Sequence, residues 1–92
     1  MSQIPVLVKD PGSVVDVGFH WADELGADTL STSAWSAEDG VTLSSPSMVG
    51  TDTIVWLSGG AIVGYRYRLV NTVTTAGGRT LERSIDVQIE NL

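Results

Sequence analysis

The stretch that decides the fold reads YRYRLVNTVTTAGGRTLERSIDVQI and covers residues 65–89. Two alternating segments flank the turn Ala76-Gly77-Gly78, a pattern typical of a β-hairpin with a three-residue loop. A two-residue loop, Gly77-Gly78, would place Leu69 opposite Asp86 and mix apolar with polar side chains on both faces. Because a one-residue slip moves every side chain to the other face, we reject that register.

The three-residue loop separates the two faces of this hairpin. One face holds the apolar pairs, which are Tyr65 with Ile89, Tyr67 with Val87, Leu69 with Ile85 and Val73 with Leu81, interrupted by Asn71 opposite Arg83. The other face holds the polar pairs, which are Arg66 with Gln88, Arg68 with Asp86 and Thr72 with Glu82. We therefore predict a long hairpin with a polar ladder that faces solvent or a partner.

The rest of the chain repeats short strand patterns between clusters of turn residues, such as Asp10-Pro11-Gly12 and Ser45-Pro46-Ser47. The predicted strands are 6–9, 14–21, 29–36, 41–44, 53–58, 63–74 and 80–90, and residues 22–27 are expected to form a short helical turn. This spacing predicts an all-β fold: a single immunoglobulin-like antiparallel β-sandwich of about seven strands, one domain over residues 1–92. Trp35 is expected in the core of such a sandwich, and Tyr67 as the tyrosine whose hydroxyl bonds back to the backbone.

The balance of charge excludes several classes of protein. The chain has 5 Lys and Arg against 11 Asp and Glu, with a net charge of −6. This is the wrong sign for gripping a phosphate backbone, so we expect no nucleic-acid partner. The apolar run at residues 4–8 is too short for a signal peptide, and no stretch approaches a membrane span. We expect synthesis in the cytoplasm and no membrane partner.

Residues for catalysis or metal binding are sparse. The single histidine, His20, follows an ordinary strand pattern, and no serine lies in a nucleophile-elbow motif. The chain has no Cys, and its loop carboxylates lack the spacing of a calcium loop. We therefore predict no catalytic, cofactor-binding or metal residue, and no enzyme.

The run Ile54-Val55-Trp56-Leu57 does not alternate, so its strand is apolar on both faces. Trp56 is then either a core residue or a hot spot for a neighbouring protein. If the chain works by binding another protein, we expect Trp56 and the ladder residues Arg66 and Arg68 to make the contact. Trp21 is expected in the core, with a sugar-stacking role for Trp21 or Trp56 as the alternative.

Two segments have a predicted role in contacts with other subunits. Residues 1–5 have little to pack against and are either disordered or extend onto a neighbour. The last strand is expected at a sheet edge, where it would be open to pairing with another subunit.

Several of these segments also resemble a known family. They are Val8-Lys9-Asp10-Pro11, Trp35-Ser36 leading to Gly40-Val41-Thr42, Val55-Trp56-Leu57-Ser58-Gly59-Gly60, residues 67–80 of the hairpin, and Glu82-Arg83-Ser84-Ile85. With them, nearly the whole chain resembles the small immunoglobulin-like virion proteins of tailed bacteriophages, of the fiber-tail adaptor type.

The resemblance implies a structural role and carries no catalytic motif. It implies a non-enzymatic adaptor in the tail region of the virion, which links the tail or connector to fiber or baseplate proteins. The implied partners are other virion proteins, including the tail tube, the connector, the baseplate and the fiber, with several copies of the chain in a symmetric assembly. The alternatives are a capsid decoration protein and, from another class, a carbohydrate-binding module.

Overall fold

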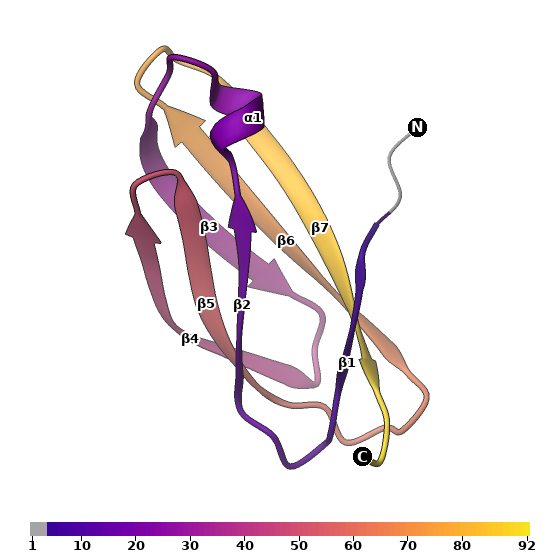
Figure 1. The fold of residues 1–92 in the computed structure, drawn as a ribbon. Coiled ribbons are helices and arrows are strands. Elements are labelled where there is room, and N and C mark those ends of the chain that lie inside the picture. Colours follow the sequence, from indigo (N-terminus) through magenta and orange to yellow (C-terminus); the bar gives the residue numbers. More distant parts are fainter. Residues whose placement is uncertain (1–3) are drawn as a thin grey trace.

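The computed structural model describes residues 4–92, which form two β-sheets packed face to face (Figure 1). The elements are β1 (Val6–Lys9), β2 (Val15–His20), α1 (Ala22–Leu25), β3 (Leu30–Ala37), β4 (Val41–Val49), β5 (Asp52–Gly59), β6 (Arg66–Thr75) and β7 (Thr80–Ile89). One sheet has the strand order β1-β7-β6-β3 and the other β2-β5-β4. The predicted all-β sandwich is confirmed.

All strand pairs are antiparallel except β1 with β7, which is parallel. The expectation of a purely antiparallel sandwich was wrong at this point. The two strands come from opposite ends of the chain, and no hairpin connects them, so nothing requires them to run in opposite directions. Apart from β1, the division of the strands between the sheets is that of immunoglobulin constant domains.

The hairpin of β6 and β7 has the predicted register. Its pairs include Tyr67 with Val87 and Arg68 with Asp86. The Thr75 amide donates to the Arg79 carbonyl at 2.9 Å and closes the three-residue loop, in which Gly78 adopts a φ of 93°. The alternation and the glycine turn act together here, because a register that buries the apolar face is also the register that this loop allows.

Strand β4 differs from the prediction, which ended it at residue 44 and placed a turn at Ser45-Pro46-Ser47. The strand continues to Val49 across a register shift between Ser44 and Ser47, where Ser45 adopts a φ of 50°. Because β4 is an edge strand, the missing N–H of Pro46 costs no ladder bond, and a bulge absorbs the irregularity. The turn residues Ser45-Pro46-Ser47 lie within the edge strand β4, so the prediction that the strand ends before them was wrong.

The last strand does not lie at a sheet edge, contrary to the expectation. Strand β1 covers the outer side of β7, and the Asp86 amide donates to the Pro5 carbonyl at 2.9 Å. The edges of this sheet are β1 and β3. The predicted extension of residues 1–5 onto a neighbour concerns residues 1–3, which lie outside the described part, and residues 4–5, which lead into β1.

The core contains two of the three tryptophans. Trp21 is 1% exposed, and the Trp35 ring stacks on Phe19 with the ring centroids 5.6 Å apart. Tyr67 is also buried, but within residues 4–92 its hydroxyl makes no hydrogen bond. The hydroxyl of Tyr65, outside the sandwich core, donates to Glu38 Oε2 at 2.9 Å instead, so the tyrosine-corner bond predicted for Tyr67 was wrong.

Candidate partner-binding surfaces

The outer face of the four-stranded sheet carries Arg66 and Arg68. Arg68 binds Asp86 through two bonds, from Nε at 2.8 Å and from Nη2 at 3.1 Å, and Arg66 Nε donates to Gln88 Oε1 at 2.9 Å. The hydrogen bond from Arg68, opposed by partial burial, lowers the pKa of Asp86 below its usual range. The predicted polar ladder therefore exists, and its charged groups largely satisfy one another across β6 and β7.

The outer face of the three-stranded sheet carries Trp56, which is 42% exposed. In the register of this sheet, Trp56 lies between Asp16 on β2 and Ser44 on β4. The structure thus excludes the core position for Trp56. It also separates the predicted partner-binding residues, because Trp56 and the arginine pair Arg66 and Arg68 lie on opposite outer faces of the sandwich.

A hollow of about 230 Å³ lies on the same face, between Asp16 and the His20–Asp52 pair, where Gly18 faces Ile54 across the strands. A β-carbon on Gly18 would lie 2.4 Å from the Thr53 carbonyl oxygen, so the close approach of β2 and β5 requires glycine here. The absent side chain leaves Ile54 only half-buried on the outer surface. The hollow is a consequence of strand packing that exposes apolar surface.

His20 and Asp52 border this hollow. His20 Nδ1 lies 2.7 Å from Asp52 Oδ1, and the imidazole side chain is 89% exposed. The pair follows directly from the register of β2 with β5. It is an ion pair or hydrogen bond at the protein surface, which agrees with the prediction of an ordinary sheet-surface histidine.

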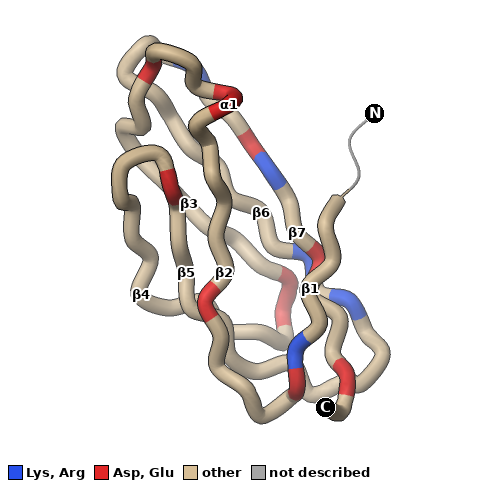
Figure 2. Tube along the Cα trace, viewed as in Figure 1, with Lys and Arg blue, Asp and Glu red and all other residues tan. Residues whose placement is uncertain are grey.

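Charged residues are unevenly distributed over the strands (Figure 2). Strands β3 and β4 carry no charged residue, and β5 carries only Asp52. Strand β7 is the richest, with Glu82, Arg83 and Asp86 along its length. The three-stranded sheet therefore presents few charged side chains on its outer surface, Asp16 and Asp52, whereas the four-stranded sheet presents mainly paired charges.

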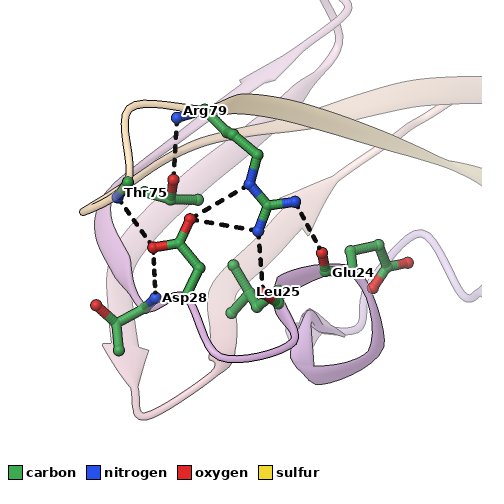
Figure 3. Close-up of polar contacts among 7 residues, drawn as sticks. Glu24, Leu25, Asp28, Thr75 and Arg79 are labelled. Carbon is green, nitrogen blue, oxygen red and sulfur yellow. Dashed lines mark hydrogen bonds and ion pairs between the residues drawn. The ribbon is translucent and has the colours of Figure 1, made fainter.

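A cluster of polar contacts joins the β6–β7 turn to the segment after α1 (Figure 3). The Asp28 carboxylate accepts bonds from the Gly77 amide at 2.9 Å and from the Arg79 guanidinium at 3.3 Å. The same guanidinium donates to the carbonyls of Glu24 and Leu25 at the end of α1. This cluster holds one end of the sandwich together and was not foreseen from the sequence, because its members are far apart along the chain.

Lys9 performs a similar task at the other end of the sandwich and was also not singled out as a structural residue. Its side chain is buried, and Nζ donates to the carbonyls of Asp10 at 2.8 Å and Gly59 at 2.7 Å. Burial lowers the pKa of its ammonium group, with Asp10 acting in the opposite direction. Within β1, Lys9 points inward on the same side as Leu7, and the three apolar residues before it gave no sign of this in the sequence.

Among residues 4–92, no group of three or more His, Cys, Asp or Glu side chains is arranged to hold a metal ion. In the same range, no helix has the length and the apolar character needed to cross a membrane.

The fold and its surfaces define a class: a small two-sheet β-sandwich whose two outer faces differ in chemistry. The family can also be stated, because a family model described as podophage GP4 fiber-tail adaptor protein gp77 matches residues 9–88, and the chain belongs to this family. It is a bacteriophage structural protein of the tail-adaptor type. No curated protein matches the chain.

Proposed function

We propose that the chain is a non-enzymatic adaptor that links the tail or connector of the phage particle to fiber or baseplate proteins. The observation that carries this proposal is the family match over residues 9–88. The two outer faces support it, because a linking protein needs two separate contact surfaces. The face with Trp56 and the face with Arg66 and Arg68 lie on opposite sides of the sandwich.

We also propose a location in the virion and a set of partners for the chain. It acts as one domain over residues 1–92, in several copies in a symmetric assembly in the tail region of the virion. Its partners are the tail tube, connector, baseplate or fiber proteins, with no cofactor, nucleic acid or membrane. The net charge of −6 supports the absence of a nucleic-acid partner. Synthesis in the host cytoplasm is part of the same proposal.

The number of copies per particle tests the location. Quantitative mass spectrometry of purified virions compares this protein with the major capsid and tail proteins. We expect a low copy number that matches one ring of the tail. A copy number near that of the capsid subunit would favour capsid decoration, and absence from the particle would contradict a structural role.

A deletion tests the linking function itself. Particles assembled without the protein should lack fibers and should not infect, and adding the purified chain should restore fiber attachment. Particles that keep their fibers and infect normally without the chain would contradict the adaptor function.

A further inference from the structure

The outer face of the three-stranded sheet holds an uncompensated carboxylate beside an exposed indole. Asp16 lies directly across from Trp56 in the β2–β5 register, and both side chains are exposed. Within the described part of the chain, the Asp16 carboxylate has neither a hydrogen bond nor an ion pair. The next carboxylate on this face, Asp52, is held by His20 at 2.7 Å. Asp16 is therefore a free negative charge next to a large aromatic surface.

No Lys or Arg side chain of the protein is available to pair with Asp16 on this face. Its five Lys and Arg residues are all engaged elsewhere. Lys9 is buried among backbone carbonyls. On the other sheet, Arg66 binds Gln88 and Arg68 binds Asp86. Arg79 binds Asp28, and Arg83 donates to the His20 carbonyl and lies over the Phe19 ring. The negative charge at Asp16 is thus left for another molecule to neutralise.

The Asp16 carboxylate lines a recess whose floor includes Gly18 and the apolar side chain of Ile54, and the His20–Asp52 pair borders it on another side. Ile54 lies two residues from Trp56 along β5, on the same face, between Gly18 and Ser47. Because Gly18 has no side chain, the hollow of about 230 Å³ exposes part of Ile54. The recess has room for one aliphatic side chain. Asp16 lines it, and Trp56 lies across from Asp16 in the β2–β5 register.

We infer that Asp16, Trp56 and Ile54 form a docking surface, the Trp56 face, for a virion protein segment that presents an arginine or lysine next to an aliphatic side chain. The cation would lie over the indole, where the ring quadrupole attracts it, and would pair with Asp16. The aliphatic side chain would fill the recess at Gly18. This inference rests on the proposed adaptor function and names the chemistry of one of its partners.

The charge at Asp16 also explains why a protein segment fits better than a sugar. A neutral sugar could stack on Trp56 and donate hydroxyl hydrogen bonds to the carboxylate, but it would supply no countercharge. A cationic segment gains from both groups at once. Tryptophan is also the residue type most enriched at protein–protein hot spots.

Rebinding to particles tests the inference. Particles assembled without the protein receive the purified full chain as wild type, Asp16→Asn or Trp56→Ala, and bound chain is measured against concentration. We expect Asp16→Asn to bind roughly three- to tenfold more weakly and Trp56→Ala more than about tenfold more weakly. The deficit of Asp16→Asn should shrink as salt is added, because salt screens the exposed pair.

Matched controls separate these effects from changes in charge or exposed area. Asp39→Asn removes one negative charge from the exposed turn between β3 and β4, and Ile62→Ala trims an exposed side chain of the β5–β6 loop. Both should bind within about twofold of wild type. Circular dichroism checks folding, and if Trp56→Ala does not fold, the surface variant Asp16→Asn still decides the question.

A second readout tests the chemistry of the partner. Overlapping peptides that tile the tail and fiber proteins of the same phage serve as the probe. Peptides that bind wild type should carry Arg or Lys next to Leu, Ile or Val, and should fail to bind Trp56→Ala. Replacing their cation with glutamine should abolish binding.

The outcomes are distinguishable. If wild type does not bind the particles, the adaptor function fails and this inference with it. If wild type, Asp16→Asn and Trp56→Ala bind alike, the inference is overturned while the adaptor function stands. Two other results would also overturn the inference, provided that binding to particles is unchanged. If Trp56→Ala alone abolishes binding of host oligosaccharides, the face belongs to a sugar. If Asp16→Asn alone abolishes self-association, the face belongs to a second copy of the chain.

Discussion

The three tryptophans show how one residue type takes three roles in a small sandwich. The Trp21 Nε1 donates to Thr53 Oγ1 and Asn71 Oδ1, both at 3.1 Å, within the core. The Trp35 Nε1 is buried but has no hydrogen-bond partner among residues 4–92. Trp56 projects from the outer face. The loss in free energy of unfolding on replacing each tryptophan should therefore depend on its surroundings and not on the type of side chain.

We predict a ranking for the replacement of each tryptophan by phenylalanine. Trp21→Phe should destabilise most, because it loses both buried area and a hydrogen-bonded donor, and should exceed Trp35→Phe by about 1–2 kcal/mol. Trp35→Phe keeps the stacked ring and removes an unpaired donor. Trp56→Phe should change the free energy of unfolding by less than about 0.5 kcal/mol. Urea unfolding measures all three, and equal losses for Trp21→Phe and Trp35→Phe would contradict the prediction.

At the scale of elements, polar contacts join strands that the hydrophobic pattern leaves unconnected. Asn71 on β6 accepts from the Thr53 hydroxyl on β5 at 2.6 Å, which links the two sheets through the core. At one end, the contacts of Asp28 and Arg79 tie the β6–β7 turn to α1 (Figure 3). These contacts hold neighbouring elements together, and the contribution of the Asp28 contacts to stability depends on pH.

Stability should depend on pH through Asp28. Hydrogen bonds from the Thr75 side chain, from the amides of Thr29 and Gly77 and from Arg79 lower the pKa of Asp28 to about 2, from an ordinary value near 3.8. The folded state therefore favours the carboxylate. Its contribution is complete above about pH 4 and is lost as the pH falls toward about 2.

The measurement compares Asp28→Asn with wild type by thermal unfolding between pH 7 and pH 2. We expect the variant to melt at a lower temperature at pH 7 and the difference from wild type to narrow as the pH falls from about 4 to about 2. The control is Asp39→Asn, which removes an exposed carboxylate from the turn between β3 and β4. A difference that stays constant over this pH range would show that Asp28 stabilises the fold without its charge.

At the scale of the whole molecule, the sandwich separates two chemically different faces. Trp56 belongs to the three-stranded sheet, and Arg68 belongs to the four-stranded sheet, with the core between them. Stacked sheets lie about 10 Å apart, and the outward side chains lie further apart still. Residues separated in this way contribute independently to binding.

We therefore expect Trp56→Ala and Arg68→Gln to weaken binding to different virion proteins. For either partner, a double-mutant cycle should show additivity within about 0.5 kcal/mol. Arg68→Gln should leave the fold intact, because the Arg68 side chain is 47% exposed and ion pairs at the surface contribute about 0–1 kcal/mol. Titration of the variants against isolated tail and fiber proteins measures the coupling, and a coupling above about 1 kcal/mol would indicate one shared interface.

The sequence by itself determined the all-β class and the register of the β6–β7 hairpin. Both are local: alternation reports which side chains share a face, and the Ala76-Gly77-Gly78 turn joins neighbouring strands. The candidate binding residues were found in the same way, since Trp56 breaks the alternation of its strand and Arg66 and Arg68 lie on the polar side of the hairpin.

Only the tertiary structure decided how distant strands pair. It placed β1 outside β7, carried β4 through Pro46 as an edge strand, and assigned Trp56 and the two arginines to opposite faces. It also brought Asp16 across from Trp56, residues 40 positions apart that no local pattern connects. The physical reason is that period-two alternation constrains side chains within one strand and its hairpin partner, whereas the neighbours of a strand in a sheet depend on the packing of the whole core.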